Sequence, residues 1–309
     1  MKGENKKSEE ENSIITIEQN EFFFDKYSYS TFEEMEDKKA YDFYAIVYDS
    51  SFPKEVEYNS SLSGQKGPRL KYSVEIKLLG QGTNSLNDPN NLSENIVTLY
   101  IQAKEQENVP YIHQIGDVIR VHKGIYLQKK QKYVYLDLLK VQNKGSWCVF
   151  SANPDKDGDG DKPYICYQKK YIYESQDKKL ISRMREFSHQ YLANNYLNYS
   201  NQNNLVERAK EESDKDLLVQ VVHKLELKDH LILFVQDVTD GCELHVLKYF
   251  NFIKENDVIR VRSYKVYNSA VLLLNEGGNI LKIPLNSQCY KTFMDNLSKK
   301  LREYLKKEN

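Results

Sequence analysis

Apolar and polar residues alternate along several short stretches in the first half of the chain. Between residues 70 and 79, Val74, Ile76 and Leu78 fall on one side and mostly polar residues on the other. A period of two residues is typical of a β-strand with one buried face. By this criterion and by apolar content, we expect strands at 43–48, 70–79, 96–103, 118–127 and 133–141, with a short helical or turn segment at 105–114.

A second set of short strands is expected at 217–225, 231–238, 243–247, 258–267 and 270–274. The two sets contain a repeated sequence, because residues 116–121 read GDVIRV and residues 256–261 read NDVIRV, 140 positions later. This interval is too long for a solenoid repeat and suits a duplicated small domain. Five strands with a short segment between the third and fourth is the order of the OB fold, a Greek-key β-barrel. The sequence therefore predicts two such barrels.

Two longer segments, at 177–196 and 288–307, have the apolar spacing of helices. The first lies between the two sets of strands, and we expect it to pack between the barrels. The polar stretch at 194–212 is expected to be a loop. The predicted fold is thus mainly β: a disordered polar tail at 1–26, an OB fold at 27–151, an acidic linker with the inter-barrel helix at 152–215, and an OB fold with a C-terminal helix at 216–309.

Composition and charge are those of soluble globular domains. Hydrophobic residues make up 40% of the 309 and charged residues 29%, and no apolar run approaches the ~20 residues of a membrane span, so we expect no membrane partner. Residues 1–12 contain no apolar stretch, which predicts an intracellular protein without a signal peptide. The net charge of −1 hides a segregation: residues 1–40 carry 6 Lys or Arg against 11 Asp or Glu, and the remainder carries a net +4. The folded parts are therefore expected to be mildly basic.

Motifs of catalysis and metal binding do not occur. None of the four cysteines belongs to a CxxC pair, so we expect reduced thiols rather than a zinc site or disulfides. The sequence has no P-loop, HExxH, GxSxG or GxGxxG motif, which argues against an enzyme and against a cofactor. The run at 155–161 resembles the start of an EF-hand loop, but its twelfth position is Cys166 rather than a bidentate glutamate. We therefore expect no metal site.

Cations and tyrosines gather around both copies of the repeat. Alternation along 118–127 predicts that Arg120, His122 and Tyr126 point outward. The other members of this predicted surface are Lys129, Lys130, Tyr133 and Tyr135 in the first barrel and Arg260, Arg262, Tyr264 and Tyr267 in the second. Cations neutralise phosphates and aromatic rings stack on unpaired bases, so the mixture favours binding to single-stranded nucleic acid. The alternative is a solvated strand face on which arginine and tyrosine cover the barrel rim.

Several segments resemble the ciliate telomere end-binding protein alpha subunit and the related protection-of-telomeres protein. The most specific is VPYIHQIGDVIRVHK at 109–123, and DFYAIVYDSSFPK at 42–54, GSWCVF at 145–150 and DVIRVRS at 257–263 support it. The resemblance runs in order through residues 27–305 and implies two OB folds that grip a single-stranded G-rich overhang. It places Lys54, Lys104, Arg120, His122, Lys123, Arg260 and Arg262 near the DNA. The family usually has an aromatic residue in the third strand where this chain has Gln102.

Two functions follow as hypotheses. The first is a nuclear protein at chromosome telomeres that binds the single-stranded G-rich overhang and caps the end, with other telomere-complex subunits as further partners. The second is a telomere-protein paralogue that keeps the barrels as a protein-interaction scaffold in a telomere or telomerase complex, with weak or no DNA binding. The retained cations and tyrosines favour the first function, and the missing family aromatics favour the second.

Overall fold

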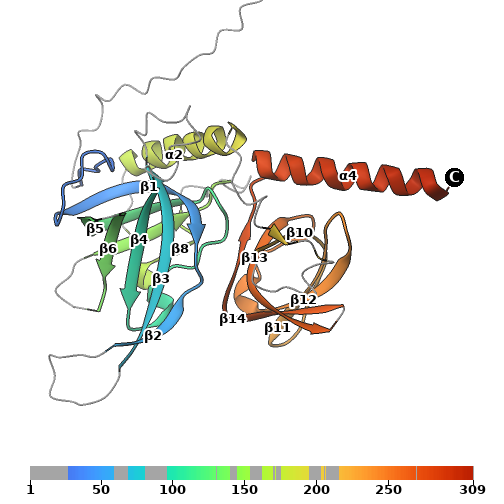
Figure 1. Cartoon of the computed structure of the whole chain (residues 1–309). Coiled ribbons are helices and arrows are strands. Elements are labelled where there is room, and N and C mark those ends of the chain that lie inside the picture. Colours follow the sequence, from blue (N-terminus) through green and yellow to red (C-terminus); the bar gives the residue numbers. More distant parts are fainter. Residues whose placement is uncertain are drawn as a thin grey trace, which may run out of the picture.

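The computed structural model describes residues 27–58, 69–80, 96–129, 131–139, 145–153, 162–169, 171, 175–194, 203–204, 206, 216–268 and 270–308. Two β-barrels lie side by side, with one helix along the top of each (Figure 1). The expected tail at 1–26, the acidic run at 155–161 and Lys130 lie outside the described residues. Most of the expected loop at 194–212 does too, although β9 (Asn203–Asn204) forms a short parallel pairing with the second barrel.

The first barrel has the strand order expected of an OB fold. Its strands are β1 (Ala40–Ser50), β3 (Arg69–Gly80), β4 (Ile96–Ala103), β5 (Val118–Gln128) and β6 (Lys132–Asp137). They pair in the cycle β1-β3-β4-β6-β5-β1, with β4 and β6 parallel, which closes the barrel. The short 3-10 helix η2 (Gln106–Asn108) falls between the third and fourth strands, as predicted. Three further strands extend the sheet: β2 (Lys54–Tyr58), β7 (Ser146–Phe150) and β8 (Ile165–Cys166).

The second barrel repeats this pattern. Its strands are β10 (Asp216–Glu226), β11 (His230–Gln236), β12 (Gly241–Leu247), β13 (Val258–Asn268) and β14 (Val271–Lys282), with the 3-10 helix η4 (Lys248–Phe250) between the third and fourth. The strands close in the cycle β10-β11-β12-β14-β13-β10, and β12 pairs with β14 in parallel. The last strand runs to Lys282, well beyond the end expected at 274. The mainly β fold with two OB-type barrels is therefore confirmed.

The sequence repeat corresponds to the turn before the fourth strand of each barrel. Gly116 and Asn256, which occupy equivalent positions, both have a positive φ, 91° and 69°. The following aspartates close the turn, because Asp117 Oδ2 accepts a hydrogen bond from Gln114 N and Asp257 Oδ2 accepts one from Lys254 N. A left-handed residue followed by a carboxylate favours this turn, which explains why the two copies share it.

A second equivalent pair lies seven residues further on and corrects the sequence analysis. Lys123 and Ser263 have φ of 56° and 60°, and each lies at a break in the pairing of its strand. Residues 122 and 123 form a bulge opposite Asp42 of β1, and Ser263 lies opposite residues 275–278 of β14. A bulge adds one residue and reverses which side chains face the core. Tyr126 and Tyr264 are therefore only 2% and 0% exposed. Their predicted outward orientation was wrong, because strict alternation was extended across the bulge.

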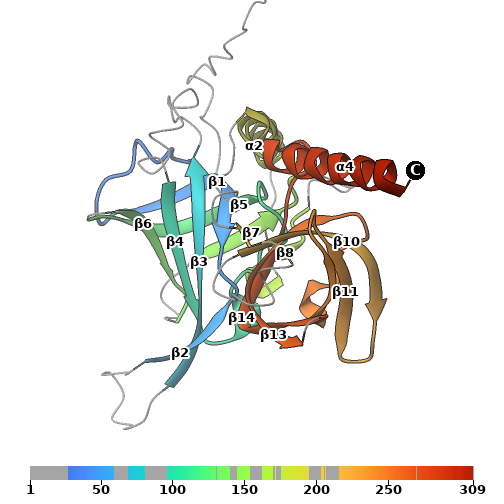
Figure 2. The same cartoon turned by 45° about the vertical axis from the view of Figure 1, so that its right-hand side comes forward.

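The two barrels share apolar packing. Phe52, from the loop after β1, packs in the core of the second barrel. Val258 and Leu281 of the second barrel pack in the core cluster of the first. The helices α2 (Ser175–Asn194) and α4 (Gln288–Glu308) join that cluster and meet above the junction (Figure 2). The two OB folds expected at 27–151 and 216–309 therefore bury apolar surface against each other.

Gly116→Ala is expected to lower the free energy of unfolding by about 1–3 kcal/mol. A Cβ at this position would lie 2.6 Å from Ser188 Oγ and 2.8 Å from Leu192 Cδ1 of α2, and φ is 91°. Urea unfolding followed by circular dichroism measures the loss. The matched control is Asn256→Gly at the exposed, equivalent turn of the second barrel, which should change the free energy by less than about 1 kcal/mol. Equal effects of the two variants would contradict this explanation of the repeat.

Candidate nucleic-acid interface

The outer face of β3, β4 and β6 in the first barrel carries tyrosines and lysines. The strands are in register, with Glu75 opposite Tyr100 and Tyr100 opposite Tyr135. Alternate residues of these strands, such as Leu99 and Val134, are fully buried, so the intervening side chains project outward. We call this surface the tyrosine face; its members are Lys71, Lys77, Tyr100, Gln102, Tyr133 and Tyr135.

Hydrogen bonds fix the centre of the tyrosine face around Gln102. Its side-chain oxygen accepts hydrogen bonds from Tyr135 Oη and from Lys71 Nζ, each at 2.7 Å. Next to it, the rings of Tyr100 and Tyr133 pack edge to face with centroids 6.1 Å apart. Burial raises the pKa of Tyr100 and of Tyr135, so both hydroxyls stay protonated near neutral pH. The arrangement presents aromatic surface, an amide and two ammonium groups on one sheet, together with the exposed Glu75 carboxylate opposite Tyr100. Of the two ammonium groups, Lys77 Nζ also lies 3.9 Å from Asp49 Oδ2.

The second and third strands of an OB fold, here β3 and β4, form the surface on which such barrels bind oligonucleotides. Of the residues singled out in the sequence, Tyr133 and Tyr135 belong to the tyrosine face. Lys71, Lys77 and Tyr100 were missed as site residues. The alternation at 70–79 already predicts the positions of Lys71 and Lys77 on the outward side of β3.

Most of the predicted lysines are exposed. Lys104 follows β4 directly, Lys129 lies in the turn between β5 and β6, and Lys123 sits at the bulge of β5. Lys54, at the start of β2, runs its aliphatic side chain along the second barrel. Its Cγ lies 3.7 Å from the point where a Cβ on Gly277 would be. Tyr267, at the end of β13, is 72% exposed. The predicted lysines are therefore spread over several strands and turns rather than gathered on one strand.

Arg120 and His122 do not point outward as predicted. Arg120 is 3% exposed, and its Nη1 forms an ion pair with Asp177 Oδ2 of α2 at 3.1 Å. Asp177 also accepts hydrogen bonds from the hydroxyls of Tyr29 and Tyr44. Burial and the neighbouring Arg120 lower the pKa of His122 to about 4, so its ring is neutral at neutral pH. The prediction failed because α2 covers this side of β1 and β5, so that β5 is buried on both faces.

Arg260, also predicted to face outward, joins the two barrels. It is 1% exposed and pairs with Asp49 of β1. Arg262 donates to Asp216 of β10 at 2.9 and 2.8 Å and to Asp49 at 3.3 Å. The Asp49 carboxylate of the first barrel thus meets two arginines of the second. The prediction of an outward Arg260 was wrong because the neighbouring barrel, rather than solvent, covers that face of β13.

The equivalent face of the second barrel has a different chemistry. Across β11, β12 and β14, Ile232, His245 and Leu273 lie in register, and all three are half-buried. The rings of His230 and His245 stack 5.7 Å apart, and Glu243 lies 3.2 Å from His245 Nε2. Apolar and histidine side chains replace the tyrosines and lysines of the first barrel. The two barrels therefore offer unequal surfaces to a nucleic acid.

Closed five-stranded barrels, the first with an outward-facing set of tyrosines and lysines, define a protein of the OB-fold class. The sequence profile of the family described as "Telomeric single stranded DNA binding POT1/CDC13" matches residues 24–197, more than half of the chain. The chain belongs to this family, whose description is that of DNA-binding proteins.

Known relatives match both halves of the chain. A telomere-binding protein homolog of Euplotes crassus is 24% identical over 79% of this chain and 52% of its own length. The telomere-binding protein 51 kDa subunit of the same organism is 25% identical over 89% of this chain and 62% of its own length. The chain thus spans about half to three-fifths of these relatives. A crystal structure of fission yeast Pot1 with single-stranded DNA has 11% identity and a TM-score of 0.40, covering 92% of this chain and 96% of that one.

In the described parts of the chain, no three His, Cys, Asp or Glu side chains gather as a metal site would require. Among those same residues, no helix combines the length and apolar character needed to cross a membrane.

Proposed function

We propose that this protein binds the single-stranded G-rich overhang of telomeric DNA through the tyrosine face of its first barrel, and that it caps chromosome ends in the nucleus. The observation that carries the proposal is the set of three outward-facing tyrosines, exposed Tyr100 on β4 and half-buried Tyr133 and Tyr135 on the neighbouring β6, beside Lys71 and Lys77 on β3. Membership of the telomeric single-stranded-DNA-binding family supports it. The role is one of binding rather than catalysis.

The chemistry of the face fits an unpaired strand. Each base has a flat apolar surface that can stack on tyrosine, and each phosphate can approach a lysine. The Gln102 oxygen accepts hydrogen bonds from Lys71 and Tyr135, so its amide nitrogen is the part of this side chain that would donate to a base. A duplex presents no open base surface, so it is expected to bind poorly. Relatives with "subunit" in their names support the further proposal that other telomere-complex subunits are partners.

Alanine at Tyr133 or at Tyr135 is expected to weaken binding of a G-rich single strand by about 1–3 kcal/mol each. Fluorescence anisotropy with labelled G-rich strand, C-rich strand and duplex, at two salt concentrations, measures this. Tyr135→Phe is the matched control, because it keeps the ring and loses only the hydroxyl that donates to Gln102. Lys77→Ala should instead reduce the dependence of log affinity on log salt by about 0.7.

A protein-interaction scaffold is the second candidate, and one observation favours it. Arg120 and Arg260 are buried and already paired with carboxylates, so two of the cations expected to meet phosphates hold the fold together. A scaffold predicts weak binding governed by salt alone, no preference for the G-rich strand, and no effect of the tyrosine substitutions. That result would move the function to protein partners.

A further inference from the structure

Two cysteines lie directly opposite each other on the last two strands of the first sheet. Cys148 of β7 pairs with Cys166 of β8 in an antiparallel ladder, and β8 ends the sheet (Figure 2). Directly opposed residues of such a ladder project from the same face of the sheet. The Cys148 side chain is buried and that of Cys166 is half-buried. The two thiols are therefore neighbours, although the residues are eighteen positions apart in the sequence.

The spacing of opposed residues in an antiparallel ladder suits a disulfide bond. Their Cα atoms lie about 4.5 Å apart in a pair without hydrogen bonds and about 5.5 Å apart in a hydrogen-bonded pair. Disulfide bonds span Cα distances of about 4.4–6.8 Å, which includes both cases. The backbone of β7 and β8 is thus already placed for a bond between the sulfurs of Cys148 and Cys166.

A buried arginine completes the row of opposed residues. Arg120 of β5 lies opposite Cys148, and its Nη2 donates a hydrogen bond to Cys148 Sγ at 3.3 Å. Burial raises the pKa of both thiols, that of Cys148 to about 11, and the Arg120 guanidinium opposes this rise in each. A thiolate is the reactive form of cysteine. We therefore expect a pair that reacts slowly at neutral pH, with the guanidinium stabilising the thiolate when it forms.

The segment that carries Cys166 also supports the junction of the two barrels. The Tyr164 hydroxyl donates a hydrogen bond to Asp117 Oδ2 at 2.8 Å and accepts one from His113 N at 3.2 Å. The rings of Tyr164 and His113 stack 4.0 Å apart, and His113 also stacks on Phe252 of the second barrel at 3.9 Å. Tyr164 thus holds the histidine through which the two barrels touch.

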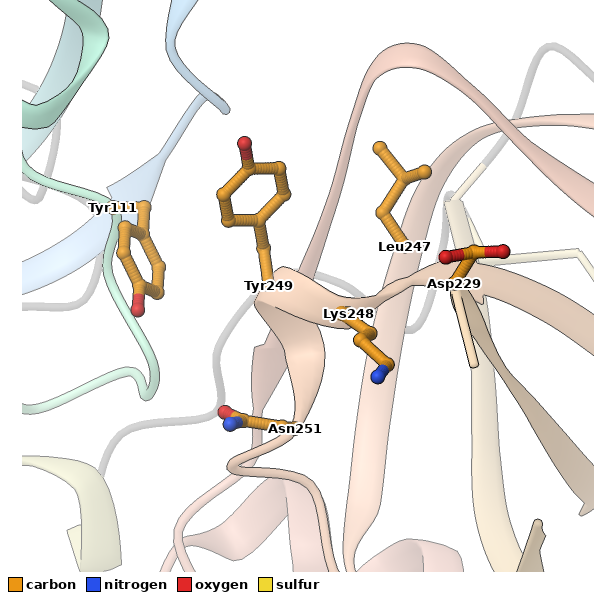
Figure 3. Close-up of a pocket in the computed structure, with 6 residues that line it drawn as sticks. All are labelled: Tyr111, Asp229, Leu247, Lys248, Tyr249 and Asn251. Carbon is orange, nitrogen blue, oxygen red and sulfur yellow. The ribbon is translucent and has the colours of Figure 1, made fainter. Parts of the chain in front are cut away.

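This stack borders a hollow of about 400 Å³ between the barrels. Tyr111, two residues before the stacked histidine, faces Tyr249 of the second barrel with ring centroids 6.4 Å apart (Figure 3). β8 pairs with β7 over only two residues, so little backbone pairing holds the segment that contains Tyr164. A covalent bond from Cys166 to Cys148 would tie this segment to the barrel and stiffen one wall of the hollow.

We propose that Cys148 and Cys166 form a redox-sensitive modification site, at which a peroxide converts the two thiols into a disulfide bond between β7 and β8. Disulfides inside cells are mostly transient and belong to redox-sensing or catalytic sites. The dithiol is accordingly the resting form, and the disulfide forms under oxidising conditions. The site needs no nucleic acid and is independent of the proposed function.

The reaction balances with hydrogen peroxide as the oxidant. The sulfur of the more accessible Cys166 attacks one peroxide oxygen, the O–O bond breaks, and a sulfenic acid and one water form. The Cys148 sulfur then attacks the Cys166 sulfur, the S–O bond breaks, and the leaving hydroxide takes the Cys148 proton as a second water. Two thiols and one peroxide thus give one disulfide and two waters, and two electrons pass from sulfur to oxygen.

Mass spectrometry of the full chain treated with hydrogen peroxide tests the site. N-ethylmaleimide, added under denaturing conditions, should label all four cysteines before the treatment and two after it. Trypsin should then release residues 145–156 joined to residues 157–169, and dithiothreitol should separate the two peptides. The disulfide is also expected to raise the melting temperature of the protein by about 4–10 °C, because it closes a loop of eighteen residues.

Cys166→Ser is the test variant, because this half-buried side chain lies at the edge of the sheet and its replacement should leave the core intact. The joined peptides and the rise in melting temperature should both be lost. Cys242→Ser, at a half-buried cysteine of the second barrel, is the matched control and should keep both. Failure of peroxide to join the two peptides in the wild-type chain overturns the site. An equal rise in melting temperature in wild type and Cys166→Ser also overturns it.

Discussion

Replacing Asp49 with alanine is expected to lower the free energy of unfolding by about 3–5 kcal/mol. Asp49 is 6% exposed, and its carboxylate faces the Arg260 guanidinium, which is 1% exposed, and Arg262. Burial by itself raises the pKa of Asp49, but the two arginines hold it below its ordinary value, so the carboxylate is charged at neutral pH. Without it, a buried cation loses its main partner at the junction of the barrels.

Urea unfolding monitored by circular dichroism measures this loss. The control is the double variant Asp49→Leu with Arg260→Met, which removes both charges and fills the space with apolar side chains. Exchange of a buried ion pair for packed apolar residues is often neutral or stabilising, so the double variant should recover most of the lost stability. A loss below about 1 kcal/mol for Asp49→Ala would show that Asp216, whose Oδ2 lies 3.5 Å from Arg260 Nε, compensates the guanidinium without Asp49.

His113→Phe is expected to stabilise the protein and to make it less sensitive to acid. The His113 ring lies in a stack between Tyr164 at 4.0 Å and Phe252 at 3.9 Å. Its Nε2 atom is buried and has no hydrogen-bond partner among the described residues. Such an atom costs about 1–3 kcal/mol. A phenyl ring keeps both stacking contacts and has no polar atom to leave unpaired.

The pH dependence of the stability follows from the direction in which the pKa of His113 is shifted. Burial, with Lys282 nearby, lowers the pKa of His113 from 6.5 to about 3. The folded state therefore favours the neutral ring. Protonation of His113 costs no stability above pH 6.5, but as pH falls toward 3 the free energy of unfolding decreases by about 1.4 kcal/mol per pH unit. Asp117 acts in the opposite direction. Burial raises its pKa from 3.8 to about 6, and its contribution to stability is lost as pH rises through that range.

Because the two groups offset each other between about pH 4 and 6, the informative quantity is the difference between variant and wild type. Urea unfolding of both proteins at pH 7, 5.5 and 4 should show the advantage of His113→Phe growing as pH falls. An advantage that stays constant over this range would mean that the ring accepts a proton in the folded state as readily as in the unfolded state.

Local alternation was sufficient to predict the strands and their grouping into two barrels. The alternation along β3, and the pairing of an aspartate with a left-handed residue in both copies of GDVIRV and NDVIRV, are properties of short segments. A period of two residues and a tight turn depend on neighbours in the chain, so they can be read without the tertiary structure. The family resemblance at 109–123 followed from the same local sequence.

Which face of each strand meets solvent was decided by the tertiary structure. Arg120 is buried because α2, more than fifty residues later in the chain, places Asp177 against it. Arg260 is buried because the other barrel places Asp49 there. Tyr126 is buried because a single residue with positive φ at Lys123 reverses the alternation. Charge and aromatic content identify which side chains can bind a nucleic acid, but burial is set by segments distant in sequence. For that reason the sequence alone determined the two barrels. The tertiary structure decided that α2 and the second barrel cover the arginine faces, whereas the tyrosine face stays open to solvent.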